Sequence, residues 1–72
     1  MEIADNIKRI RQLRHKTQAE VAEESGILLD TYRQIEQGRI KEMGVFKAAA
    51  IAEALGVSIT DLLSNSESRS VT

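Results

Sequence analysis

The sequence has no cysteine, no proline and no apolar run longer than a few residues. Without cysteine there is no disulfide framework and no cysteine-based zinc site. A membrane span needs about 20 apolar residues, so a span and a signal-peptide core are excluded. The lack of proline and of alternating β-branched residues, beside many Ala, Glu, Gln, Arg and Leu residues, favours helices. We therefore expect an all-α, soluble and cytoplasmic protein.

The length of the chain limits its core. A chain of 72 residues forms at most one domain, and a domain of this size buries only about 60% of the surface exposed on unfolding. Residues 64–72 are polar and serine-rich, so they are predicted to form a disordered tail or a truncated linker. The domain is therefore expected to span residues 1–63.

The formal net charge of −1 hides an uneven distribution of charge. Residues 7–17 contain five basic residues and no acidic one: Lys8, Arg9, Arg11, Arg14 and Lys16. Residues 18–30 contain acidic residues and no basic one. Residues 31–47 are net basic again through Arg33, Arg39, Lys41 and Lys47. The charge must therefore be considered segment by segment.

Helix signals divide the chain into five elements. Asp5 can cap a first helix, in which apolar residues recur at helical spacing at Ile3, Ile7, Ile10 and Leu13. Thr17 and Glu20 match a capping box, which predicts a second helix of about eight residues that ends at Gly26. A third helix is expected at about residues 28–36, before Gly38.

Two further helices follow the loop at residues 38–44. The first begins at Val45 and ends at Gly56, with one apolar face formed by Val45, Ala48, Ile51, Ala52 and Leu55. Ser58 and Asp61 again resemble a capping box, and they start a short helix that should direct Leu62 and Leu63 inward. His15, the single histidine, is expected in a turn in the left-handed conformation.

The second and third helices are joined only by Ser25, Gly26 and Ile27. Two short helices joined by a turn of this length containing glycine form a helix-turn-helix. Ala22 is small where the two axes would cross, and Gly26 can take a positive φ in the turn. Together these features predict such a unit.

The segments NIKRIRQLR, TQAEVA, GI, IEQG and AEALGVSITDLL stand in this order between residues 5 and 63. In this order and spacing the chain resembles the Cro and lambda-repressor-like (XRE-type) helix-turn-helix domains. The resemblance implies a five-helix DNA-binding domain, usually dimeric, with its third helix in the major groove. It also implies an ion pair between Arg11 and Glu36, which would set the orientation of the helices more than their stability.

The expected DNA contacts fall into two groups. Backbone N–H groups in the first turn of the second helix would bind one phosphate, together with Thr17 and Gln18. A second phosphate would be reached by Gln37, Arg39 and Lys41. By resemblance to the family, the residues that face base edges are Leu29, Asp30, Arg33 and Gln34.

The start of the third helix leaves two alternatives. Leucine cannot cap a helix, so Leu28 and Leu29 could form an extended entry to a helix that Asp30 caps. If the helix begins at Leu28 instead, both leucines could contact thymine methyls and Asp30 could accept from cytosine. Tyr32 is bulkier than the residue usual at this position in the family.

Three classes of function are compatible with these features to different degrees. We expect a sequence-specific, repressor-type regulator that binds a palindromic operator in double-stranded DNA as a homodimer. The alternative is a protein-interaction or antitoxin-type module that uses Leu28, Leu29 and the acidic second helix. An enzyme has little support, because the sequence has one histidine, no phosphate-binding glycine motif and no convincing carboxylate pair. We expect no cofactor, metal, membrane or small-molecule substrate.

Overall fold

The computed structural model describes residues 3–40 and 43–63 of the chain. This part contains five helices and no strand: α1 Ile3–Leu13, α2 Gln18–Ser25, α3 Leu29–Glu36, α4 Val45–Leu55 and α5 Ile59–Leu63. The expected all-α class and the number of helices are thereby confirmed. The expected tail, residues 64–72, lies outside the described residues.

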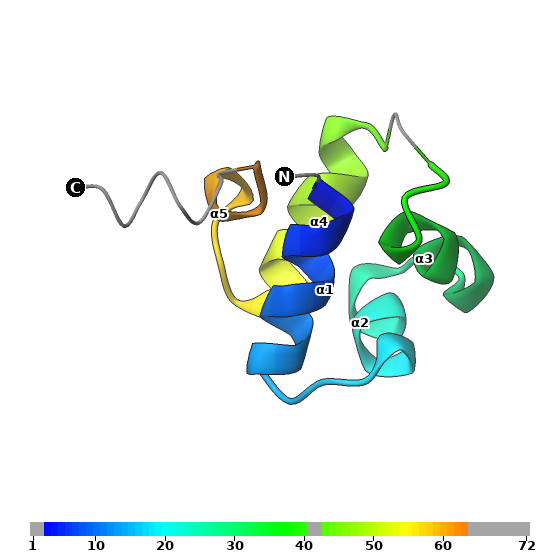
Figure 1. Ribbon diagram of the computed structural model, residues 1–72, viewed down its shortest axis with the longest axis horizontal. Helices are drawn as coiled ribbons and strands as arrows, with labels where there is room; N and C mark the ends of the chain where they lie inside the picture. Colours follow the sequence, from blue (N-terminus) through cyan, green and yellow to red (C-terminus); the bar gives the residue numbers. More distant parts are fainter. Residues whose placement is uncertain (1–2, 41–42, 64–72) are drawn as a thin grey trace.

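The helices are arranged around α1 and α4. Figure 1 shows α2 and α3 on one side of this pair and α5 on the other. The contacts agree with the view, since α4 packs against α1, α2 and α5, while α3 packs against α1 and α2. The α2–α3 unit is therefore held on one side of the domain, with a face of α3 left uncovered.

The core takes residues from all five helices. Its buried members are Ile7, Ile10, Val21, Ala22, Tyr32, Ile35, Ile51, Ala52, Leu55 and Leu62. Complete burial of one large aliphatic side chain contributes about 1.5–3 kcal/mol. Ala22, which is only 2% exposed, lies where the sequence places the crossing of α2 and α3. Its single methyl group lets the two backbones approach closely.

The local signals of α2 and of its turn are confirmed. The Thr17 side chain accepts from the backbone N–H of Glu20 at 3.0 Å, and the Glu20 carboxylate accepts from the backbone N–H of Thr17 at 2.8 Å. Gly26 ends α2 with φ 72°. The backbone N–H of Ile27 then donates to the carbonyl of Ala22 at 2.9 Å, which closes the turn into α3.

The turns at the other helix ends also follow the sequence. His15 is left-handed, with φ 58°, as predicted for this turn residue. Gly38 follows Gln37, the C-cap residue of α3, and has φ 77°. Ser58 and Asp61 form the expected reciprocal pair of hydrogen bonds, each 3.2 Å long, at the start of α5.

The prediction that Asp5 caps α1 is wrong. This helix begins at Ile3, so Asp5 lies within its first turn and is not the cap. A carboxylate in the first turn still interacts favourably with the positive end of the helix dipole. The buried Asn6 side chain donates to the carbonyl of Leu62 at 2.9 Å and ties α1 to α5.

Three apolar residues that belong to the predicted apolar faces are exposed. Leu13 is 65% exposed, and Val45 and Leu63 are each 64% exposed. All three occupy a terminal residue of a helix, where the neighbouring helices do not cover the side chain. The period of the pattern was correct, but burial also requires a second element over each position.

Candidate nucleic-acid interface

The first turn of α2 is the first part of the candidate interface. An α-helix leaves its first backbone N–H groups without partners inside the helix. The Thr17 hydroxyl oxygen satisfies the N–H of Glu20 and keeps its own proton available to donate. Because the helix dipole is positive at this end, the turn can bind a phosphate oxygen.

Gln18 lies between this turn and α3. Its side-chain Nε2 donates to Glu36 Oε1 at 3.1 Å. An amide nitrogen carries two hydrogens, so one remains for a phosphate. Gln18, which is expected to contact a phosphate, is therefore also bonded to Glu36. This hydrogen bond fixes the amide of Gln18 beside α3.

Arg11 and Glu36 form the ion pair that the resemblance implied. Arg11 Nε lies 2.6 Å from Glu36 Oε2, and the side chains are only 12% and 3% exposed. Arg11 Nη2 donates to Glu36 Oε1 at 3.2 Å, and Nη1 donates to the carbonyl of Lys16 at 2.8 Å. The guanidinium thus joins α1, the α1–α2 turn and α3.

Tyr32 completes this buried network. Its ring is fully buried, and its hydroxyl donates to Glu36 Oε2 at 2.5 Å. Burial alone would raise the pKa of Glu36, but hydrogen bonds from Arg11, Tyr32 and Gln18 outweigh burial and lower it. Burial and the neighbouring carboxylate raise the pKa of Tyr32, so its hydroxyl stays protonated and donates. Glu36 is therefore a charged acceptor for donors from three helices.

The structure decides between the two alternatives for the start of α3. The helix begins at Leu29, with Leu28 as an extended N-cap residue that makes no side-chain capping bond. Asp30 consequently lies in the first turn, and the alternative in which it caps a later helix is wrong. Its exposed carboxylate is available to a ligand at this turn.

One face of α3 is exposed. Asp30, Arg33, Gln34 and Gln37 are exposed, while Tyr32, Ile35 and Glu36 on the opposite side are buried. Three of the four expected base-contacting residues therefore share the open face: Asp30, Arg33 and Gln34. The fourth, Leu29, is half-buried and packs against the core. Leu28 is the more exposed leucine, at 78%.

The segment after α3 carries the second expected group of phosphate contacts. Gln37 and Arg39 are exposed. The backbone N–H of Arg39 donates to the carbonyl of Gln34 at 3.0 Å, which fixes the chain as it leaves the helix. Lys41 lies outside the described residues.

Phe46 and Lys47 were not predicted from the sequence as candidate site residues. Together with Leu28 and Thr31 they line a hollow of about 350 Å³ between the start of α3 and the start of α4. Phe46 is 88% exposed. It follows Val45 directly and lies off the apolar stripe of α4, and that displacement was the signal available in the sequence.

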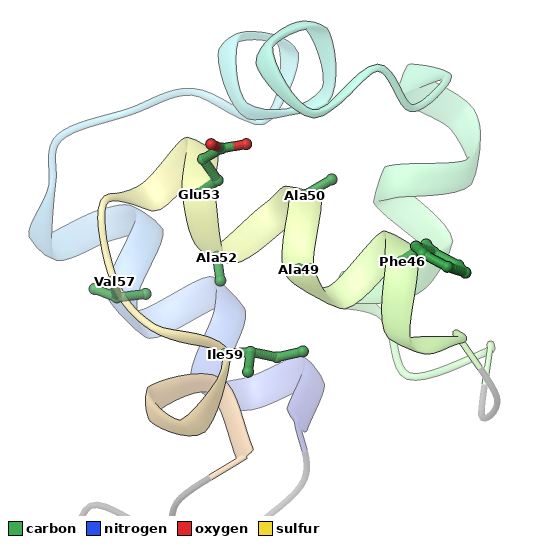
Figure 2. A pocket seen from close by; sticks show the side chains of 7 residues that line it. All are labelled: Phe46, Ala49, Ala50, Ala52, Glu53, Val57 and Ile59. Atoms are coloured by element: carbon green, nitrogen blue, oxygen red, sulfur yellow. The ribbon is translucent and has the colours of Figure 1, made fainter.

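A second hollow extends along α4 towards α5. Figure 2 shows Ala50 and Glu53 projecting from one side of α4, Phe46 from its first turn, and Val57 and Ile59 beyond its end. Among the described residues that line it, Glu53 is the charged one, through its carboxylate. A phosphate would therefore be repelled here, and this hollow does not belong to the candidate DNA surface.

The comparison with protein families agrees with this geometry. A family model described as helix-turn-helix matches residues 7–62, which cover α2, α3 and α4 and most of α1 and α5. The chain belongs to this XRE-type helix-turn-helix family. This XRE-type protein is therefore a DNA-binding regulator. A search of the curated proteins found no match.

The described part of this XRE-type protein contains neither a metal-binding cluster nor a membrane-spanning helix. Among residues 3–40 and 43–63, no group of three His, Cys, Asp or Glu side chains could hold a metal ion. No helix in the described part of the chain is long and apolar enough to cross a membrane.

Proposed function

We propose that this protein is a repressor-type transcriptional regulator that reads the major groove of double-stranded DNA with α3. Repression would result from occupation of a palindromic operator by a homodimer in the cytoplasm. The observation that carries this proposal is the two-sided character of α3. Asp30, Arg33 and Gln34 are exposed on one face, while the opposite face is locked to α1 and α2 through Glu36.

The side chains on the open face suit base edges. Arg33 would bind guanine through two hydrogen bonds and Gln34 would bind adenine, and each pair is worth about 1–3 kcal/mol of discrimination. Asp30 in the first turn would accept from the amino group of cytosine. Leu29 would offer only the exposed part of its side chain to a thymine methyl, since the rest packs inward.

Phosphate contacts would fix α3 between the two strands of the DNA. One phosphate would bind at the start of α2, with Thr17 and Gln18, and the other after α3, with Gln37, Arg39 and Lys41. Gln18 supports this arrangement, because its amide bonds to Glu36 and thereby couples the first phosphate position to α3. No enzymatic step, metal or cofactor is part of this function.

Selection from random DNA duplexes, followed by a salt titration, tests the proposal. We expect one enriched motif and binding that weakens as salt rises. Gln34→Ala should relax specificity at one base pair, whereas Arg39→Ala should weaken all duplexes similarly and reduce the salt slope by about one. Gln12→Ala is the control, because it removes an exposed glutamine from α1 and should change neither property.

Two results would contradict the proposal. The first is the absence of any enriched motif together with no salt-dependent binding at low salt. The second is an equal, sequence-independent loss for Gln34→Ala and Arg39→Ala, which would remove the base-reading role from Gln34.

A second candidate function is binding to a protein, as in an antitoxin-type module. It is favoured by the apolar pair Leu28 and Phe46, which line one hollow and are 78% and 88% exposed. The acidic surface of α2 favours it less, because Glu20 belongs to the capping box and Glu24 pairs with Lys16 at 2.6 Å. If the duplex selection fails, protein binding becomes the better candidate.

A further inference from the structure

Lys16 directly precedes Thr17, the N-cap of α2, and it is held through both its backbone and its side chain. Its backbone N–H donates to the carbonyl of Arg11 at 3.2 Å, and its carbonyl accepts from Arg11 Nη1 at 2.8 Å. Its Nζ donates to Glu24 Oε1 at 2.6 Å and to the carbonyl of Ala54 at 3.0 Å. Lys16 therefore joins α1, α2 and α4 beside the first candidate phosphate site.

The bond to Ala54 lies at the end of α4. The last carbonyls of an α-helix have no partner inside the helix. In α4 the backbone N–H of the C-cap Gly56 takes up the carbonyls of Ala52 and Glu53. The Lys16 ammonium takes up the carbonyl of Ala54, where a cation is favoured because the helix dipole is negative at this end. Lys16 thus fastens the start of α2 to α4 at a point where α4 needs a donor.

The ammonium of Lys16 is engaged inside the protein, although this residue belongs to the basic segment at residues 7–17. The side chain of Lys16 is 30% exposed, and that of Glu24 is 48% exposed. An ion pair this exposed adds little to stability by itself. Two of the three N–H donors of the ammonium are used, and the Glu24 carboxylate offsets its charge. The contact therefore matters mainly for where it holds α2.

We propose that Lys16 is a positioning residue of the phosphate site at the start of α2, and that it acts on DNA through Thr17 and Gln18 without binding a phosphate itself. This inference rests on the proposed function, which assigns a phosphate to that turn. The free backbone N–H groups of a first turn point along the helix axis, so the orientation of α2 sets their direction. If α2 tilted, these donors would leave the phosphate while Glu36 still held α3 to Arg11.

Direct binding of a phosphate through the third ammonium proton is the competing role for Lys16. The two roles predict opposite effects of removing the Glu24 carboxylate. If Lys16 binds a phosphate, Glu24→Gln frees the ammonium and removes an anion, so the affinity for DNA rises. If Lys16 positions α2, the same change loosens the start of α2, and the affinity falls. The sign of the change therefore distinguishes the two roles.

Salt titrations of binding to the selected motif and to a scrambled duplex test the proposal. Lys16→Met keeps an unbranched apolar side chain and removes the charge. It should weaken both duplexes about fivefold or more, at the lower end of the usual coupling between two sites, and leave the salt slope unchanged. Glu24→Gln should weaken both about two- to fivefold, the range for an exposed ion pair. The double variant should lose no more than Lys16→Met alone, because both changes break the same link.

Glu23→Gln is the matched control, because Glu23 is the neighbouring exposed glutamate of α2. It removes the same charge and leaves the bond between Lys16 and Glu24 in place, so the affinity should stay equal or rise slightly. Without DNA, the amide NMR shifts of Gln18 and Ala19 should change in Lys16→Met and Glu24→Gln far more than in the control. Circular dichroism at the binding temperature checks that each variant is folded. Should Lys16→Met not fold, Glu24→Gln decides, since it replaces an exposed side chain.

Three results would overturn the positioning role. A salt slope reduced by about one in Lys16→Met would make Lys16 a direct phosphate contact. Unchanged affinity in folded Lys16→Met would leave Lys16 with a structural role only. A rise in affinity in Glu24→Gln at least as large as in Glu23→Gln would show that the ion pair restrains a DNA contact. If the wild type binds no duplex while the shifts of Gln18 and Ala19 change as expected, the proposed function fails, but Lys16 still holds the start of α2.

Discussion

Replacing Tyr32 by phenylalanine removes one oxygen atom from the centre of the domain. The ring is fully buried, so the phenyl group keeps nearly all of its packing. What disappears is the hydrogen bond from the hydroxyl to Glu36 Oε2, which is 2.5 Å long. The substitution therefore measures how much this bond contributes to fixing α3.

The magnitude follows from the charge of the acceptor. A hydrogen bond to a charged group contributes about 1.5–3 kcal/mol to stability, roughly twice the value for a neutral pair. Glu36 would keep its bonds to Arg11 and Gln18, so the carboxylate would remain paired. We expect Tyr32→Phe to lower the free energy of unfolding by about 1.5–3 kcal/mol at neutral pH.

The effect should depend on pH. The pKa of Glu36 is lowered in the folded protein from its ordinary 4.5. A group of this kind contributes stability above its unfolded pKa and loses that contribution as pH falls through the folded pKa. Removing the hydroxyl reduces the shift, so wild type and Tyr32→Phe should differ most near neutrality and converge at pH values below 4.5.

Urea unfolding followed by far-UV circular dichroism measures the difference at several pH values. This signal reports helices and does not depend on the single tyrosine. A loss below about 0.5 kcal/mol at neutral pH would refute the reasoning, because it lies under the range for a bond to a charged acceptor. A difference that stays constant down to acid pH would show that the hydroxyl does not act on the carboxylate.

Two further substitutions probe the two ends of α3. Arg11→Met should destabilise the protein by about 3–5 kcal/mol in urea unfolding, because it leaves the Glu36 carboxylate buried without its cation. Adding Glu36→Leu should restore part of this loss. A double variant whose loss is the sum of the two single losses would contradict the pairing. Leu28→Ser should raise stability by about 0.5–2 kcal/mol, because serine supplies the side-chain cap that α3 lacks; no gain in the unfolding midpoint would show that the first turn of α3 does not need a cap.

Much of the site could be predicted because it follows from local rules. The exposure of Arg33 and Gln34 on the open face follows from helical periodicity, once Ile35 is taken as buried. The resemblance supplied the pair Arg11 and Glu36, which are 25 positions apart in the sequence. The internal bond of Gln18 and the hydroxyl of Tyr32 were not predictable, since both depend on where α1, α2 and α3 meet.

The sequence by itself determined the helices, their turns and the helix-turn-helix unit. Thr17 with Glu20, and Gly26, act over four residues or fewer, so their effect can be read without knowing the rest of the fold. Tertiary structure decided which apolar positions are covered. Leu62 is fully buried while Val45 and Leu63, in equally apolar patterns, are exposed. A periodic pattern fixes the face that a side chain occupies, but only the packing of distant helices decides whether anything lies against it.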